Sequence, residues 1–135
     1  MVQLVKTAKQ AEPALAAGLA AASKKAERIA ILDVADHLVI TDYFVICSGN
    51  SERQVRTIAE EIEHQLHRAV GLKPYRREGE REARWLILDY VDFVVHVFHK
   101  EDREYYDLER LLADAPRLDP TWEEQDEPTA AAEAP

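Results

Sequence analysis

The stretch Ser48-Gly49-Asn50-Ser51 could hold an anion, because it follows an apolar run and precedes a charged helical pattern. A strand, a turn of small residues and a helix N-terminus together form a common phosphate cradle. A Walker loop, however, needs a longer glycine-rich turn that ends in Lys-Ser or Lys-Thr. Ser51 and Gln54 have the spacing of a capping box, in which each side chain bonds the other residue's backbone amide. The sequence therefore predicts a capped turn here.

Two carboxylates, Asp89 and Asp92, offer a catalytic alternative. Nucleotidyltransferases begin a helix after a Gly-Ser turn and place metal-binding carboxylates on neighbouring strands. Magnesium held by carboxylates and substrate phosphates fits that chemistry. The alternative function is thus a metal-dependent nucleotidyltransferase that uses Asp89 and Asp92. We prefer a protein that is not an enzyme, because the capping box accounts for the same turn and Ser48 precedes the glycine instead of following it.

The histidines and the single cysteine predict no metal site and no cofactor. His64 and His67 lie one turn apart on a predicted helix, but no third ligand has suitable spacing. Two further histidines, His96 and His99, project to opposite faces of a predicted strand. Cys47 has no partner for an internal disulfide and is interpreted as a small buried apolar residue.

The charge of the chain limits its partners. The 135 residues carry a net charge of −9, and the segment from Pro116 to Pro135 has six acidic residues against one basic residue. An acidic protein is repelled by phosphate backbones, so a basic protein surface is the better partner. One local cluster is basic, and we interpret it as a solvated loop of mixed charge, with a phosphate contact as the alternative; it consists of Lys73, Arg76, Arg77, Arg81 and Arg84, interleaved with Glu78, Glu80 and Glu82.

The order of predicted elements defines the fold class. Helical and strand periods alternate as α-β-β-α-β-β-β-α, which indicates a single α/β (α+β) domain with a mixed sheet of about five strands flanked by helices. The predicted elements are a helix over Pro13–Ala26, strands Ile29–Val34 and Tyr43–Ser48, a helix capped by Ser51 and ended by Gly71, strands Leu72–Arg77, Trp85–Tyr90 and Phe93–Phe98, and a helix over Glu101–Leu112.

The same pattern divides the chain into three parts. Residues 1–12 are interpreted as an N-terminal extension, residues 13–115 as the domain, and residues 116–135 as an acidic tail too poor in apolar residues to order. No stretch approaches the ~20 apolar residues of a membrane span, and no signal-peptide pattern is present, so we expect a cytoplasmic protein.

The predicted hairpin carries the aromatic residues that are candidates for an interface. Strand alternation places Trp85 and Asp89 on one face and Leu86 and Tyr90 on the other. If the helices cover only part of the sheet, large aromatics stay exposed and mark a contact surface. The alternative is that all of them are core residues whose polar atoms bond at its margin.

Three ordered motifs resemble those of the ribosomal silencing factors, also called Iojap-like proteins. The resemblance covers roughly Ala14 to Leu118. Its motifs are Asp42–Ile46 followed by Ser48–Ser51; Glu78-Gly79 followed by Trp85, Leu88–Tyr90, Asp92 and Val94–Phe98; and Arg103–Glu109.

The resemblance implies a nucleotidyltransferase-like fold without a working catalytic site. It also implies binding to the fourteenth protein of the large ribosomal subunit, blocked association with the small subunit and repressed translation. Ribosomal RNA is then at most a peripheral partner, and the free protein forms a homodimer. Carried over by position, the contact residues are Trp85, Asp89, Tyr90, His96, Phe98 and Tyr105.

One departure from the family concerns the hairpin turn. Val91 stands where the family usually has glycine. A β-branched residue resists positive φ, so we expect a turn that needs this conformation to be adjusted here.

Overall fold

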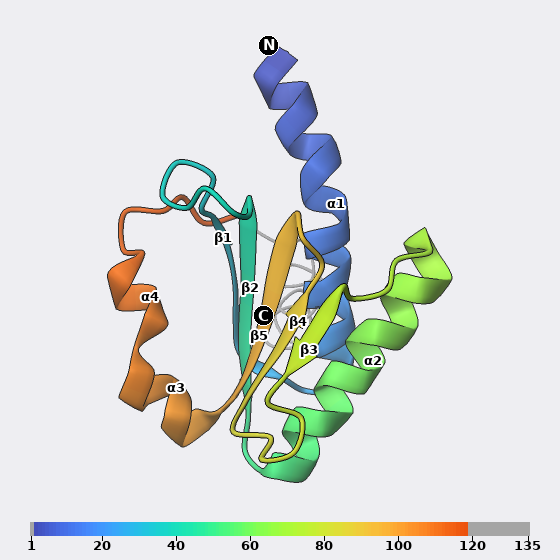
Figure 1. Cartoon of the computed structure of the whole chain (residues 1–135), viewed down its shortest axis with the longest axis vertical. Coiled ribbons are helices and arrows are strands. Elements are labelled where there is room, and N and C mark those ends of the chain that lie inside the picture. Colours follow the sequence, from blue (N-terminus) through green and yellow to red (C-terminus); the bar gives the residue numbers. More distant parts are fainter. Residues whose placement is uncertain (1, 119–135) are drawn as a thin grey trace, which may run out of the picture.

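The structure is a computed structural model that describes residues 2–118, with side chains from Ala11 onward. Five strands form one sheet in the order β1-β2-β5-β4-β3, in which β2 and β5 are parallel and the other pairs are antiparallel. This mixed sheet with flanking helices confirms the predicted fold class (Figure 1). The elements are α1 (Val2–Ser23), β1 (Glu27–Asp33), β2 (Tyr43–Gly49), α2 (Glu52–Val70), β3 (Arg76–Glu78), β4 (Trp85–Asp89), β5 (Phe93–His99), α3 (Lys100–Tyr106) and α4 (Leu108–Leu111).

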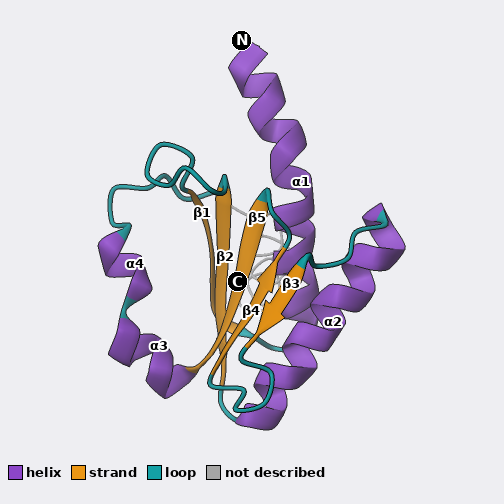
Figure 2. Cartoon of the chain, viewed as in Figure 1, coloured by secondary structure: helices purple, strands orange, loops and turns teal. Residues whose placement is uncertain are grey.

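The two faces of the sheet carry separate apolar cores. Helices α1 and α2 lie together on one side, and α3 and α4 lie on the other (Figures 1 and 2). Small alanines of α1 let that helix approach the sheet closely, and every second residue of β2 and β5 meets them. On the opposite face, Phe44, Ile46 and Phe98 pack with Leu112. Strands β2 and β5 are therefore covered on both sides, as their apolar runs predicted.

The first helix differs from its prediction. It begins at Val2, not at Pro13, which lies inside it. An internal proline removes one backbone hydrogen bond, and the buried Ala11 and Ala14 on either side of it hold the helix against the core.

Two further elements differ from their predicted bounds. Strand β3 has only the three residues Arg76–Glu78, and the predicted helix over Glu101–Leu112 is divided in two. The division occurs at Asp107, whose left-handed backbone (φ 50°) ends α3 while its N–H donates to the Arg103 carbonyl. Asp tolerates the left-handed conformation better than most residues, so the chain can change direction between α3 and α4.

The prediction of a disordered tail is wrong for its first three residues, 116–118. The Asp33 N–H donates to the Pro116 carbonyl (2.8 Å), and the Leu118 N–H donates to the Ile31 carbonyl (2.9 Å). These bonds protect the outer edge of β1, which would otherwise leave backbone groups unpaired. The rest of the predicted acidic tail, residues 119–135, lies outside the described residues. Among the helices described, none has the length and apolar character needed to cross a bilayer.

The hairpin turn keeps its left-handed conformation despite the valine. Val91 has φ 74°, so the expectation of an adjusted turn is wrong. Its N–H donates to Asp89 Oδ1 (2.8 Å), and the Asp92 N–H donates to the Tyr90 carbonyl (2.9 Å). The Asp42 N–H also bonds the Asp92 carbonyl, so three hydrogen bonds hold a backbone geometry that glycine would adopt without strain.

Candidate partner-binding face

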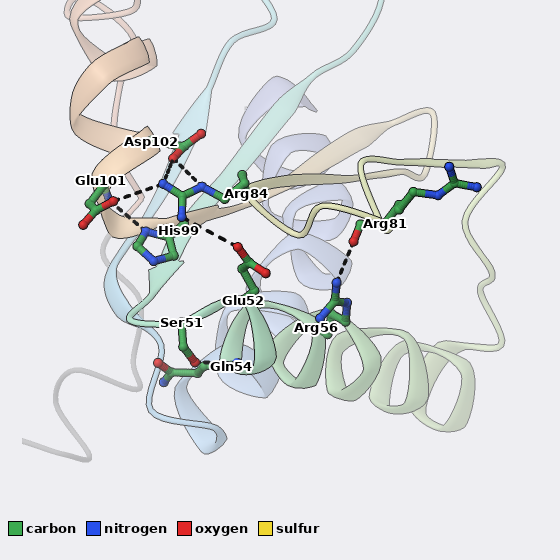
Figure 3. Close-up of polar contacts among 9 residues, drawn as sticks. All are labelled: Ser51, Glu52, Gln54, Arg56, Arg81, Arg84, His99, Glu101 and Asp102. Atoms are coloured by element: carbon green, nitrogen blue, oxygen red, sulfur yellow. Dashed lines mark hydrogen bonds and ion pairs between the residues drawn. The ribbon is translucent and has the colours of Figure 1, made fainter.

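The Ser48–Ser51 turn is occupied by bonds within the chain. Ser51 Oγ accepts from the Gln54 N–H (3.1 Å), as the predicted cap requires (Figure 3). The return bond of Gln54 goes to the Asn50 N–H (2.7 Å), one residue earlier than the predicted partner. The same side chain donates to the carbonyls of Lys24 and Lys25. The turn therefore connects α1, β2 and α2 through hydrogen bonds.

A partly exposed arginine lies at the position where open α/β sheets bind ligands. Helices α2 and α3 follow the parallel strands β2 and β5 onto opposite faces, which makes this a topological switch point. Arg84 lies there, with Asp102 at 2.6 Å, Glu101 at 3.1 Å and Glu52 at 3.9 Å (Figure 3). These acids stand in the first turns of the two helices, where a phosphate would otherwise be attracted. This position is filled by ion pairs and repels phosphate.

The carboxylates of the catalytic alternative lie at the other end of the sheet. Tyr43 pairs with Phe93 beside the turn that carries Asp92, whereas Gly49 pairs with His99 at the Ser48–Ser51 turn. Seven residues of extended β2 separate the two ends by about 20 Å. Within the described residues, no group of three or more His, Cys, Asp or Glu side chains could hold a metal ion. The arrangement that a nucleotidyltransferase needs is thus not formed by Asp89 and Asp92.

One part of the sheet has no helix over it. On β4, Leu86 and Leu88 are buried beneath α2, while the alternate residues are only half-buried. Helix α3 contacts β2 and β5 and leaves the neighbouring β4 uncovered on that side (Figure 2). We call this surface the open face; its half-buried residues are Trp85, Ile87, Asp89 and Val94.

Trp85 is held in one orientation at the margin of the open face. Its Nε1–H donates to His96 Nδ1 (3.1 Å), and its ring stacks on Phe98 with centroids 4.8 Å apart. Tyr106 of α3 packs against the same ring at 4.7 Å. A tryptophan fixed in this way loses little conformational freedom when a partner covers it.

His96 supports Trp85 as a neutral imidazole. Its side chain is buried, and burial lowers the pKa of His96 to about 3. Because Nδ1 accepts from Trp85, the ring proton resides on Nε2, which has no hydrogen-bond partner among the described residues. The Phe44 ring lies 4.4 Å away and completes an apolar setting. His96 and the fully buried Phe98 therefore form the layer beneath Trp85 and are not themselves exposed.

The remaining two candidates lie in opposite environments. Tyr90 is 8% exposed on the face covered by α1 and α2, stacked on Phe93 at 4.8 Å, and burial raises the pKa of its hydroxyl. This position argues against Tyr90 as a contact residue. Tyr105 is 81% exposed on α3, edge-on to Tyr106. Sequence analysis missed Tyr106 and Ile87, although strand alternation placed Ile87 beside Trp85.

Known proteins match most of the chain. A family model described as "Ribosomal silencing factor during starvation" matches residues 7–135. The chain belongs to this ribosomal silencing factor family. The silencing factor of Bacillus subtilis is 48% identical over 103 residues, which span 76% of this chain and 86% of the relative. A solved structure from Chromobacterium violaceum superposes with a TM-score of 0.71 at 31% identity, covering 74% of this chain and 82% of that one.

A mitochondrial protein and a second bacterial structure are also similar to the chain. The mouse protein named "Mitochondrial assembly of ribosomal large subunit protein 1" is 33% identical over 90 residues, which are 65% of this chain and 40% of the relative. A solved structure from Bacillus halodurans has a TM-score of 0.65 and 42% identity, covering 76% of this chain and 92% of that one.

In this silencing-factor chain, the third motif contains a buried arginine with a network of hydrogen bonds, which we call the lock. Arg103 is 2% exposed and donates to both carboxylate oxygens of Glu109 (3.0 Å each). It also donates to Ser48 Oγ and to the Glu27 carbonyl (3.2 Å each), so α3 and α4 are tied to β1 and β2. Burial alone would raise the pKa of Glu109, but the hydrogen bonds and charge of Arg103 outweigh it and hold that pKa below its usual value. The lock places Tyr106 against Trp85, and Tyr105 lies edge-on to Tyr106.

Proposed function

We propose that this chain binds the large ribosomal subunit in the cytoplasm, through the fourteenth protein of that subunit, and thereby blocks association with the small subunit and represses translation. Family membership supports silencing of ribosomes, and the name of the mouse relative refers to the large subunit. The observation that carries the proposal is the open face with its fixed Trp85.

The chemistry of the open face suits a basic protein partner. Its centre is apolar, with Ile87 and Val94 half-buried, and Asp89 contributes a carboxylate. An apolar centre with an aromatic anchor and a charged margin is the usual composition of a protein interface. The net charge of −9 favours the approach of a basic ribosomal protein. Trp85 would serve as the anchor, with Tyr105 and Tyr106 at the margin.

The function proposed is steric and not catalytic. Arg84 and the carboxylates that pair with it occupy the ends of β2 and β5, and the Ser48–Ser51 turn caps α2. A protein bound to the subunit-joining surface needs no chemistry to prevent joining. The homodimer implied by the family resemblance stays a prediction, which sedimentation equilibrium of the free chain would test.

Binding to purified large subunits tests the proposal. We expect Trp85→Ala to weaken binding by 2 kcal/mol or more, roughly thirtyfold, as truncated tryptophan anchors commonly do. Leu19→Ala is the control, because Leu19 is an exposed apolar residue on α1, on the other side of the sheet. Circular dichroism shows that each variant is folded at the assay temperature. Equal binding by a folded Trp85→Ala variant would remove the open face as the contact.

A further inference from the structure

A basic segment stands out in this acidic chain. From His64 to Arg77 the sequence has four Lys or Arg residues, two histidines and no Asp or Glu, although the whole chain carries −9. The segment forms the last turns of α2, the Gly71 turn and the start of β3. Arg76 pairs with Asp89 and so borders the open face, whereas the rest of the segment lies at the end of α2 and in the Gly71 turn.

The segment surrounds a cavity of about 330 Å³ between the end of α2 and β3. The side chains that line it are Glu63, His64, His67, Leu72, Lys73, Pro74 and Arg77. Its polar lining comes from α2 and from Lys73 and Arg77, and its apolar lining comes from Leu72 and Pro74. A hollow of this size has room for a phosphate group and part of an attached sugar.

The charges of the lining leave a positive excess. Glu63 is the only carboxylate among the described lining residues, and Arg77 pairs with it at 3.1 Å. Burial raises the pKa of Glu63, although its ion pair with Arg77 opposes the shift. Within residues 11–118, neither Lys73 nor Arg68 makes an ion pair, and both are exposed. Arg68 stands one turn beyond His64 on the same helix face.

The helix end does not oppose an anion strongly. A helix C-terminus presents free carbonyls that repel negative charge. Here the Gly71 N–H donates to the His67 carbonyl (3.0 Å), and the Leu72 N–H donates to the Leu66 carbonyl (3.2 Å). Gly71 can close this cap because it adopts a left-handed conformation (φ 70°). The carbonyls of His67 and Leu66 are therefore satisfied.

An aromatic side chain stands beside the cationic groups. Tyr75 is 73% exposed between Pro74 and Arg76, and the Arg76 guanidinium lies 5.8 Å from its ring centroid. Cations interleaved with an exposed aromatic ring characterise surfaces that contact nucleic acids, because the cations meet phosphates while the ring stacks on a sugar or base.

We propose that the cavity and its flanking Arg68 and Tyr75 bind the phosphodiester backbone of RNA. The identification of that RNA as ribosomal rests on the proposed function. The site lies on the α2 side of the sheet and the open face lies on the other (Figure 1). One molecule can therefore hold a ribosomal protein with the open face while this corner contacts neighbouring RNA. The contact is secondary, since the chain as a whole is acidic.

Salt dependence of large-subunit binding tests the proposal with charge-matched variants. Arg68→Glu with Lys73→Glu removes the two cations of the site that make no ion pair in the described residues, whereas Lys24→Glu with Arg53→Glu makes the same change of net charge at exposed positions elsewhere. Each phosphate contact contributes about 0.9 to the logarithmic salt slope, so two contacts account for about twelvefold of the affinity lost between 50 and 200 mM salt. We expect the Arg68/Lys73 variant to lose that part of the salt dependence and the Lys24/Arg53 variant to keep it. Equal slopes for the two variants would overturn the RNA contact.

A measurement on the free chain separates this proposal from the proposed function. A short RNA duplex should shift the NMR signals of His64, His67 and Lys73 in the native chain and leave them unshifted in the Arg68/Lys73 variant. Shifts produced equally by inorganic phosphate at the same phosphate concentration would overturn RNA as the ligand and indicate a site for small anions. If no variant binds large subunits, the proposed function fails while the NMR result still stands.

Discussion

Replacing Arg103 with methionine should destabilise the domain more than any other single loss of charge in the described part of the chain. The substitution keeps much of the side chain's volume but removes the donor to both Glu109 carboxylate oxygens and to Ser48 Oγ, while the Glu27 carbonyl keeps its hydrogen bond from Ser48 Oγ. Removing one partner of a buried ion pair costs about 3–5 kcal/mol. Because Glu109 retains 25% side-chain exposure, we expect the lower end, ~3 kcal/mol. For a domain of this size that corresponds to a fall in Tm of roughly 12 °C.

Arg84→Met is the matched control for this experiment. Arg84 also pairs with several carboxylates, but its side chain is 35% exposed, so water can replace the lost bonds. We expect this change to cost much less stability than Arg103→Met, because exposed ion pairs contribute little. Both variants are compared by urea unfolding followed by circular dichroism. If Arg103→Met costs no more than Arg84→Met, the lock does not hold α3 and α4 as described.

The pH dependence of unfolding tests the same lock independently. The folded-state pKa of Glu109 is lowered, so its contribution to stability is present above the unfolded-state pKa and is lost as the pH falls through the folded-state value. Lowering the pH should therefore reduce the free energy of unfolding of the native chain more than that of the Arg103→Met variant, in which the pKa shift of Glu109 is absent. Parallel curves for the two proteins would contradict this role of Glu109.

Two smaller changes concern the hairpin. Val91→Gly should raise the free energy of unfolding by ~0.5–1 kcal/mol, because the strain of a left-handed valine exceeds the freedom that glycine adds to the unfolded chain. Val91→Ala keeps the left-handed strain and should not raise it. The midpoints of urea unfolding distinguish the two results. Tyr90→Phe removes a buried hydroxyl that has no partner among the described residues, so we expect unchanged or higher Tm and unchanged large-subunit binding. Loss of binding by folded Tyr90→Phe would return Tyr90 to the contact surface.

Local patterns in the sequence were sufficient for the capped turn and the hairpin. Ser51 and Gln54 are three residues apart, and strand alternation correctly separated Trp85 from Tyr90. Alternation does not say which face the helices cover, because that depends on where α1 and α2 pack. Trp85 and Tyr90 were therefore equivalent candidates until the packing showed Tyr90 beneath the helices.

Interactions over long sequence separations escaped the sequence analysis. Arg103 bonds Ser48, 55 residues earlier, and no local pattern in the sequence indicates so distant a partner. The left-handed Asp107 gives only a weak local signal, and the single helix predicted across it was wrong. Pro116–Leu118 looked too polar to order, but the unpaired edge of β1 supplies backbone partners that composition cannot reveal.

Inhibition of subunit association tests the central claim most directly. Purified large subunits are incubated with the native chain, small subunits are added, and joining is followed by light scattering. We expect the native chain to suppress joining at concentrations that saturate the large subunit. Ile87→Glu, which places a charge on the open face while keeping Trp85, should allow joining, and Leu19→Ala should suppress it as the native chain does. Suppression by folded Ile87→Glu equal to that of the native chain would contradict a silencing mechanism based on the open face.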